Sequence, residues 1–175
     1  SQFGINQANI DKNGGAGPSY DRTPVGWNTF DGAWTLDSMY DDAVGSQGTI
    51  IVAHRTNNIG SIDDPNPTPV YYGLANDTSV FTAIPGLSVS GGIVCISPYL
   101  VYYGSDGLVG WSDINQPQTL TGGDSGSDRI TGAKVVKGLP LRSASGPAAL
   151  LWSLDSVIRM DYVGGAAIFK FSTVT

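Results

Sequence analysis

Residues 92–111, which read GIVCISPYLVYYGSDGLVGW, carry the pattern that decides the fold class. Three short runs rich in β-branched and aromatic residues follow one another, and Ser105-Asp106-Gly107 separates the last two. Such residues favour strands, whereas Ser, Asp and Gly favour tight turns. The runs are residues 93–96, 100–104 and 108–111. The stretch therefore predicts three short antiparallel strands joined by turns.

The same three-run pattern occurs before and after this stretch. The first runs start at residues 50, 93 and 150, which are 43 and 57 residues apart. The first spacing fits a propeller blade of roughly 40–50 residues. The sequence Val-Tyr-Tyr-Gly also occurs twice, starting at residues 70 and 101. The runs outside the central stretch are residues 50–53, 70–73, 80–84, 150–153, 157–160 and 168–171.

These runs predict an all-β fold, a β-propeller-like array of about three short antiparallel meander blades. The content of 24 Gly and 10 Pro agrees with many turns and no helices. Typical propellers have roughly 4–8 blades, so three units do not close a ring. Two arrangements stay open: the chain is part of a larger propeller, or its units form a sandwich.

Residues 1–46 differ from the rest of the chain. We predict a loop-rich N-terminal arm or insertion there, and propeller-like blades over residues 47–175. Residues 26–34 alternate large and small side chains, which predicts a short hairpin or an extended arm. Trp27 and Trp34 are better suited to anchoring a core or an interface than to forming a platform for a sugar ring.

The charge content argues against a nucleic-acid-binding groove. The net charge is −6, only 14% of residues are charged, and the nine basic residues are scattered without a run of Lys or Arg. A groove for DNA needs clustered positive charge, so we expect at most passive contact between an acidic wall and passing DNA. No stretch approaches the ~20 apolar residues of a membrane span, and no pattern suggests a signal peptide.

The sequence predicts no metal site and no cofactor. One His and one Cys rule out the usual zinc ligand sets, and Cys95 in its apolar run is expected to be a buried, inert thiol. Asp124 and Asp128 could offer oxygens to Ca²⁺, but the EF-hand spacing is absent, and Asp63-Asp64 is no better. A phosphate loop and a dinucleotide fingerprint are also absent.

Two pairs of adjacent tyrosines stand out, at residues 71–72 and 102–103. Neighbouring residues on a strand point to opposite faces, so each pair places one ring on each side of its strand. We expect these rings to lie in the core and at interfaces rather than to form a ligand cage.

An alternative enzymatic interpretation is a trypsin-like serine protease. Residues 123–126 read Gly-Asp-Ser-Gly, the nucleophile motif of that family, and the only histidine follows Val52-Ala53. His54 would be the general base, Ser125 the nucleophile, and Asp106 or Asp113 the residue that orients the imidazole. However, residues 126–129 continue as a polar loop instead of a core strand, so Ser125 lacks rigid support. We therefore predict no catalytic residues.

Residues from about 48 to 175 resemble a family of tailed-bacteriophage virion proteins. In outline they are similar to the β-propeller proteins of the tail nozzle, or DNA-retaining plug region, of short-tailed phages. Such relatives are usually several hundred residues long, and in them the loop before Gly132 has no catalytic role. The stretches that carry the resemblance are residues 86–92, 98–100, 103–109, 132–142 and 151–159.

The resemblance implies a non-catalytic structural component of the phage particle, located in the tail or at the head-to-tail junction. Its expected partners are portal, adaptor or tail subunits and further copies in a homo-oligomeric ring. The eight Tyr and four Trp agree with extensive contact surfaces. A carbohydrate- or receptor-binding β module of a tail fibre is the second interpretation, and the protease with His54 and Ser125 is the third.

Overall fold

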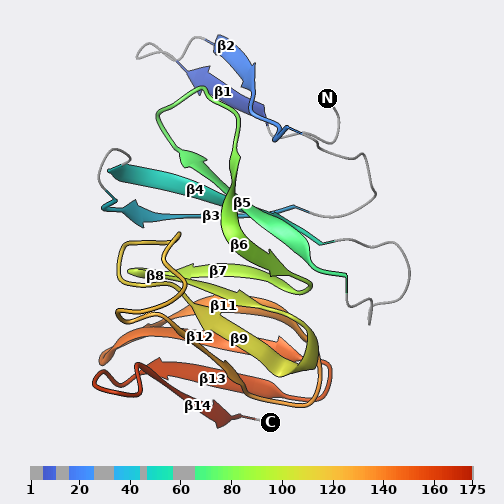
Figure 1. Cartoon of the computed structure of the whole chain (residues 1–175), viewed down its shortest axis with the longest axis vertical. Helices are drawn as coiled ribbons and strands as arrows, with labels where there is room; N and C mark the ends of the chain where they lie inside the picture. The colour runs from blue at the N-terminus through green and yellow to red at the C-terminus, as the bar shows by residue number, and fades with distance from the viewer. Residues whose placement is uncertain (1–5, 11–15, 26–33, 44–46, 57–65, 175) are drawn as a thin grey trace.

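Three four-stranded antiparallel sheets follow one another along the chain in the computed structural model (Figure 1). The structure describes residues 6–10, 16–25, 34–43, 47–56 and 66–174. Within these residues the fold is all-β, and η1 (Ser105–Gly107) is a single 3₁₀ turn. None of the described residues forms a helix long and apolar enough to cross a membrane. The fold class predicted from the sequence is therefore confirmed.

Each sheet is a simple meander, with its strands paired in chain order. A separate two-stranded hairpin precedes them, formed by β1 (Asn6–Ile10) and β2 (Ala16–Asp21). The first sheet contains β3 (Trp34–Asp41), β4 (Gly48–Arg55), β5 (Thr68–Leu74) and β6 (Thr82–Val89). The second contains β7 (Gly92–Ile96), β8 (Tyr99–Tyr103), β9 (Leu108–Trp111) and β10 (Gly126–Arg129). The third contains β11 (Val135–Ser143), β12 (Gly146–Ser153), β13 (Val157–Tyr162) and β14 (Phe169–Thr173).

The nine predicted runs all overlap strands, but each sheet has a fourth strand that the pattern did not indicate. These additional strands are β3, β10 and β11. Strand β10 reads Gly-Ser-Asp-Arg and pairs only with β9, so it is a polar edge strand. Strand β11 contains Gly138 and Pro140, two residues that strands disfavour. Pairing with a neighbouring strand overrides these weak local preferences.

The first sheet begins before the predicted domain boundary. Strand β3 pairs with β4 from Trp34 opposite Arg55 to Asp41 opposite Gly48. The boundary predicted between residues 46 and 47 therefore falls inside the first sheet, between its first two strands. The predicted hairpin or arm over residues 26–34 lies outside the described residues except for Trp34, which begins β3.

The apparent sequence repeat does not follow the structural one. The first Val-Tyr-Tyr-Gly lies on β5, the third strand of its sheet, whereas the second begins on β8, the second strand of its sheet. The sheets themselves begin at residues 34, 92 and 135. The repeating unit is thus the four-stranded meander, and the two similar tetrapeptides occupy different places in it.

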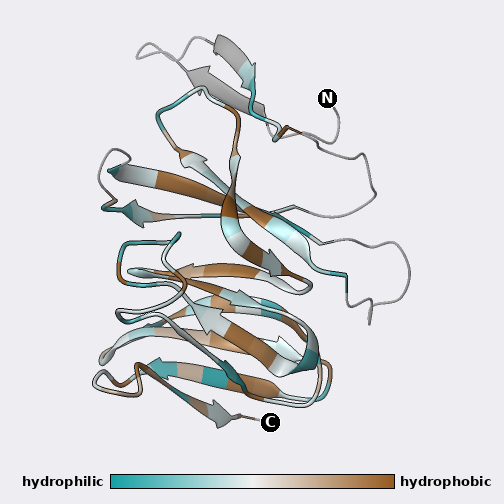
Figure 2. Cartoon of the chain, in the orientation of Figure 1, coloured by the Kyte–Doolittle hydropathy of each residue, from teal (hydrophilic) through white to brown (hydrophobic). Residues whose placement is uncertain are grey.

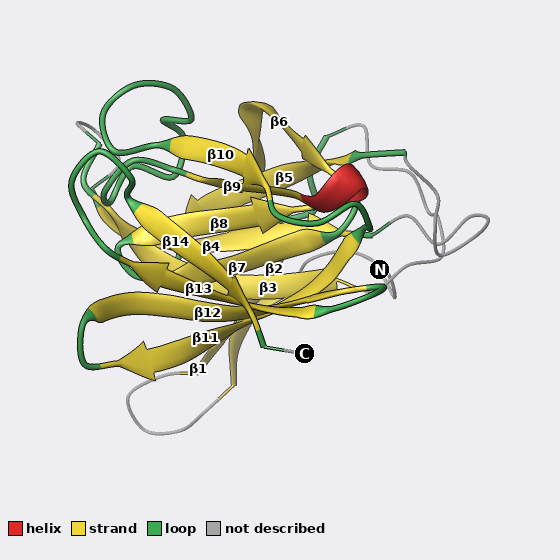
Figure 3. Ribbon diagram, turned by 90° about the horizontal axis from the view of Figure 1, so that it is seen from below, coloured by secondary structure: helices red, strands yellow, loops and turns green. Residues whose placement is uncertain are grey.

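The sheets stack face to face, and the first strand of each lies beside the first strand of the next. Strand β7 contacts β3 and β4 on one side and β11 and β12 on the other. Figure 3, which looks along the stack, shows that the strands of all three sheets run in the same order across the molecule. This arrangement is compatible with that of successive propeller blades, in which β3, β7 and β11 would be the innermost strands. The described residues form an open stack rather than a closed ring.

Two apolar cores fill the spaces between the sheets. The first joins Met39, Ile50 and Val52 of the first sheet to Ile93 and Tyr102 of the second. The second core joins residues of the second and third sheets, among them Val94, Tyr103, Trp111, Ala149, Leu151, Met160 and Phe169. Apolar segments lie mainly along the strands of all three sheets (Figure 2).

The central sheet is buried on both faces, which explains its unbroken apolar sequence. All ten residues of β7 and β8 are buried. Tyr102 enters the first core and Tyr103 the second, so the two rings point to opposite faces as predicted. The Tyr103 hydroxyl accepts a hydrogen bond from the Gly138 amide at 2.9 Å and donates one to the Ile93 carbonyl at 3.3 Å. That side chain therefore connects the second and third sheets through a polar contact inside the core.

Candidate functional site

His54 is fully buried on β4, where it has a structural environment. Its Nε2 lies 3.0 Å from the Val89 carbonyl oxygen and 2.9 Å from the Thr68 hydroxyl, which itself donates to the Arg55 carbonyl. Nε2 is therefore the protonated nitrogen and donates to Val89. Nδ1 is also buried and has no hydrogen-bond partner among the described residues. Burial lowers the pKa of His54 to about 4, although the contacts with Val89 and Thr68 act in the opposite direction.

Ser125 lies in the loop before β10, and its hydroxyl donates to the Gly122 carbonyl at 2.5 Å. Asp113 accepts hydrogen bonds from the amides of Ile114 and Asp124, so its carboxylate organises the same loop. Neither residue contacts the imidazole of His54. The nucleophile, base and orienting carboxylate of the protease interpretation are therefore not brought together.

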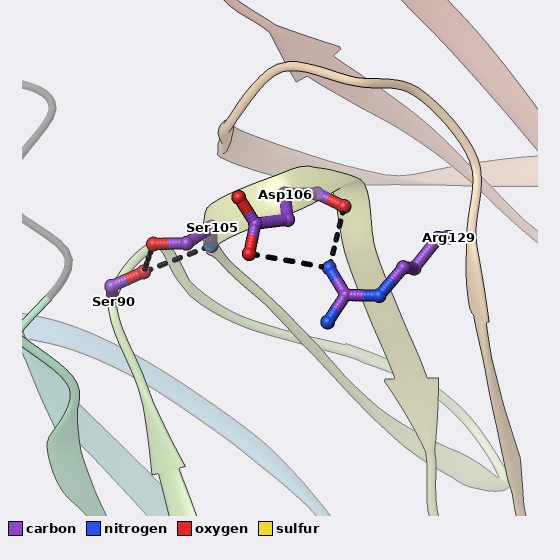
Figure 4. Close-up of polar contacts among 4 residues, drawn as sticks. All are labelled: Ser90, Ser105, Asp106 and Arg129. Carbon is purple, nitrogen blue, oxygen red and sulfur yellow. Dashed lines mark hydrogen bonds and ion pairs between the residues drawn. The ribbon is translucent and has the colours of Figure 1, made fainter.

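The other candidate carboxylate, Asp106, is part of a turn between β8 and β9. Arg129 on β10 donates to the Asp106 carbonyl at 2.9 Å and lies 3.4 Å from its carboxylate (Figure 4). Beside it, the Ser90 and Ser105 hydroxyls are 2.7 Å apart. Asp106 has a positive φ of 54°, in the left-handed region that residues other than glycine adopt only uncommonly. Its role here is to fasten the edge strand β10 to the turn.

The Gly-Asp-Ser-Gly loop forms one wall of a shallow groove of about 410 Å³. The opposite wall is the turn before β14, and Trp111 and Phe171 line the groove. Trp111 is only 8% exposed, its Nε1 donates to the Asp124 carbonyl at 2.9 Å, and Phe169 packs edge-on against it at 5.3 Å. The indole thus supports the groove from below and does not offer a free aromatic face.

The structure also bears on the candidate metal ligands and on the single thiol, Cys95. No group of three or more His, Cys or Asp residues within the described part of the chain could hold a metal ion. Asp63-Asp64 lies outside the described residues. Cys95 is a buried free thiol, as predicted, and burial raises its pKa, with a further contribution from Asp37.

Trp34 and Tyr71 belong to a small apolar cluster on the outer face of the first sheet. Their rings are 6.4 Å apart and pack edge to face. Trp34 therefore acts as a packing anchor, as predicted, whereas Trp27 lies outside the described residues. Arg22 covers part of this face, since its guanidinium lies 4.5 Å from the ring of Phe81 and its Nε donates to the Ser79 carbonyl at 2.7 Å.

The first-sheet outer face also exposes apolar residues on β3. Leu36 and Tyr40 are 56% and 48% exposed, and they alternate with Met39, which enters the first core. Both exposed side chains therefore point away from the second sheet.

The third-sheet outer face carries a larger apolar stripe. Gly138 on β11 faces the second sheet, since a Cβ there would lie 2.8 Å from Val94, so its neighbour Leu139 points outward. Leu139 is 46% exposed and pairs with Leu150. Leu141, Leu150, Trp152 and Val157 continue the stripe as half-buried residues, and Lys137, Arg159, Asp161 and Lys170 surround it.

The charges are distributed unevenly along the chain, although the basic residues form no run. Residues 129–175 contain six of the nine basic residues and two of the fifteen acidic ones. Residues 1–128 contain three basic and thirteen acidic residues. The segment that forms the third sheet is therefore net positive, whereas the segment that contains the hairpin and the first two sheets is net negative. Counting charges by segment would have detected this asymmetry from the sequence alone.

Comparison with protein-family models, with curated proteins and with solved structures finds no match to this chain. The two outer faces are therefore the candidate functional surfaces on physical grounds alone. Sequence reasoning did not identify Leu36 or Leu139 because both lie on strands, β3 and β11, that the three-run pattern missed.

Proposed function

We propose that this chain is a non-catalytic structural component of a bacteriophage particle, in its tail or at its head-to-tail junction. The observation that supports this most directly is the open stack of three meanders, with apolar residues exposed on the outer face at each end. A β-sheet face of this kind is stabilised when another protein surface covers it. The resemblance of residues 48–175 to phage virion propeller proteins supplies the biological setting.

The contacts of the stack suit a load-bearing role. Adjacent sheets are joined by continuous apolar cores, and the polar links between them, such as Tyr103 to Gly138, are buried. In this proposal the neighbours are portal, adaptor or tail subunits, together with further copies of the chain in a ring. The net charge of −6 disfavours binding to DNA phosphates, so any contact with passing DNA would be passive.

The proposal is tested by locating the chain in particles. An antibody raised against the chain is used to probe purified phage particles, and mass spectrometry measures its copy number relative to the major capsid protein. We expect a fixed copy number per particle and labelling at the tail or neck. Absence from purified particles would refute the structural role.

The carbohydrate-binding alternative predicts a different result. It requires cell-surface glycans to bind the isolated chain and to shield a tryptophan from quenchers. A glycan array and acrylamide quenching of tryptophan fluorescence measure this directly. Binding would favour the receptor-binding module over the proposed function, and it would place the chain at a fibre tip.

A further inference from the structure

We propose that the groove between the β9–β10 loop and β14 binds an arginine side chain of a neighbouring protein subunit. One wall of this groove of about 410 Å³ comes from residues 123–128 and the other from residues 165–171. The inference names the chemistry of one contact that a structural subunit makes, so its biological setting rests on the proposed function. It follows from two carboxylates on one wall, from the apolar floor beside them and from the fixed shape of the loop.

The lining of the groove is acidic. It contains Asp124 and Asp128 and no Lys, Arg or His among its residues, all of which the structure describes. Neither carboxylate takes part in an ion pair within the described residues, where Arg129 and Arg159 are paired with other aspartates. The groove therefore attracts a cation from another molecule.

Two cationic residues are adjacent to the groove in sequence but point away from it. Asp128 lines the groove, and neighbouring residues of a strand point to opposite faces, so Arg129 points away. Lys170 is the cross-strand partner of Asp161 on the outer face of the third sheet. Both cations thus lie on other surfaces, which leaves the charge of the groove negative.

The floor of the groove is apolar and suits a guanidinium better than an ammonium group. Trp111 and the half-buried Phe171 line it, with ring centroids 6.2 Å apart, and Ile168 lines it as well. An arginine stem packs on such a surface, and its planar head stacks on an aromatic ring while it donates to carboxylates. The volume is near the lower end of the roughly 300–1,000 Å³ typical of ligand pockets, which fits one long side chain better than a large ligand.

The loop that carries Asp124 has a fixed backbone conformation. The Asp124 amide donates to the Asp113 carboxylate at 3.0 Å, and the Trp111 indole donates to the Asp124 carbonyl at 2.9 Å. Gly122 and Gly123 have positive φ values, and a Cβ on Gly123 would lie 2.2 Å from the Asp113 carboxylate. A loop held in this way loses little conformational freedom when it binds a partner, which favours binding.

The test is a nuclear magnetic resonance titration of the isotope-labelled full chain. The probe is the peptide acetyl-Gly-Arg-Gly-amide, and the same peptide with citrulline in place of arginine keeps the shape but removes the charge. Asp124→Asn and Asp128→Asn each remove one groove carboxylate. Asp161→Asn is the matched control because it removes a carboxylate from the outer face of the third sheet. Amide signal dispersion and thermal unfolding check that every variant keeps the fold.

We expect the arginine peptide to cause saturable shifts of the amide signals of residues 124–128 and of the Trp111 indole N–H, and we expect high salt to weaken binding. Each groove variant should raise the dissociation constant about fivefold or more, because a charge-assisted hydrogen bond is lost. The Asp161→Asn variant should bind as the unmodified chain does.

Three results would overturn the inference. Equal affinity for the citrulline peptide would show that binding does not depend on the cation. Shifts that persist unchanged in both groove variants would place the peptide elsewhere on the molecule. The absence of shifts at millimolar peptide would show that the groove does not bind arginine.

The inference and the proposed function fail separately. A chain that is present in particles but does not bind the arginine peptide keeps its structural role and lacks this contact. A chain that binds the peptide in the groove but is absent from particles has the site without the proposed role.

Discussion

At the scale of single residues, buried polar side chains distinguish this stack from a purely apolar one. His54 donates through Nε2 to Val89 within the first sheet, and the Tyr103 hydroxyl links the second sheet to the third. Buried polar groups are costly unless they are hydrogen-bonded. The contribution of each side chain to stability therefore depends on one polar group, the imidazole of His54 or the hydroxyl of Tyr103, and can be measured by changing that group.

We predict that the free energy of unfolding decreases in mild acid because His54 is buried in its neutral form. Its pKa is about 4 in the folded protein against 6.5 in the unfolded chain, so the unfolded chain binds the proton first as the pH falls. The stabilisation is complete above pH 6.5 and decreases as the pH falls toward 4. Between about pH 7 and 4.5 the unfolding free energy should drop by about 2.5 kcal/mol from this residue. Urea unfolding of the chain and of His54→Gln at both pH values measures it; equal pH dependence in the two proteins would contradict the assignment.

Tyr103→Phe removes the hydroxyl while keeping the ring. The buried Gly138 amide then loses its acceptor, so we expect a destabilisation of about 1–3 kcal/mol. Tyr40→Phe is the control, because the Tyr40 ring is half exposed on β3, and it should change stability by less than about 0.5 kcal/mol. Thermal unfolding compares the two variants. Equal effects would show that the Tyr103 hydroxyl does not connect the sheets.

At the scale of elements, the turns and first strands set how closely the sheets approach. Gly91, between β6 and β7, is buried, and a Cβ there would lie 2.2 Å from the Val135 carbonyl oxygen and 2.7 Å from that of Tyr103. Both atoms belong to the backbone, so neither can move aside without shifting a sheet. Glycine is required at this position by the spacing of the second and third sheets.

Gly91→Ala should therefore destabilise the chain by about 2 kcal/mol or more, because overpacking against backbone forces the sheets apart. Gly132→Ala is the matched control, since nothing lies within 4 Å of its Cβ position. Denaturant unfolding of both variants gives the comparison. A Gly91→Ala protein as stable as the control would mean that the two sheets are not held at this distance.

Apolar strands could be predicted from the sequence, whereas strands with polar, glycine or proline residues could not. Runs such as residues 93–96 predicted strands because the central sheet is buried on both faces and needs apolar residues throughout. The polar edge strand β10 and the glycine- and proline-containing β11 were missed because their own residues do not favour strands, and each forms by pairing with an apolar neighbouring strand, β9 or β12. The exposed stripe around Leu139 was missed with β11. Whether His54 and Ser125 lie close together likewise depends on the tertiary structure, which a motif of four residues does not encode.

At the scale of the whole molecule, two features coincide: a repeated meander and an unbroken stack of first strands. The meander gives each sheet two faces that can be covered, and the stack covers all except the two outermost, of which Arg22 covers part of the one on the first sheet. The exposed apolar residues on those two faces are what a subunit of a larger β assembly would present. Our account therefore relates the open stack to the proposed structural role in a phage particle.

The most direct test of this role is a cryo-EM reconstruction of the particle, with the chain traced into the density. We predict three four-stranded blades in a symmetric ring at the tail or neck, with β3, β7 and β11 toward the axis and other protein against the outer face of the third sheet. Density that places the chain at a fibre tip, or a particle that lacks it, would contradict the account.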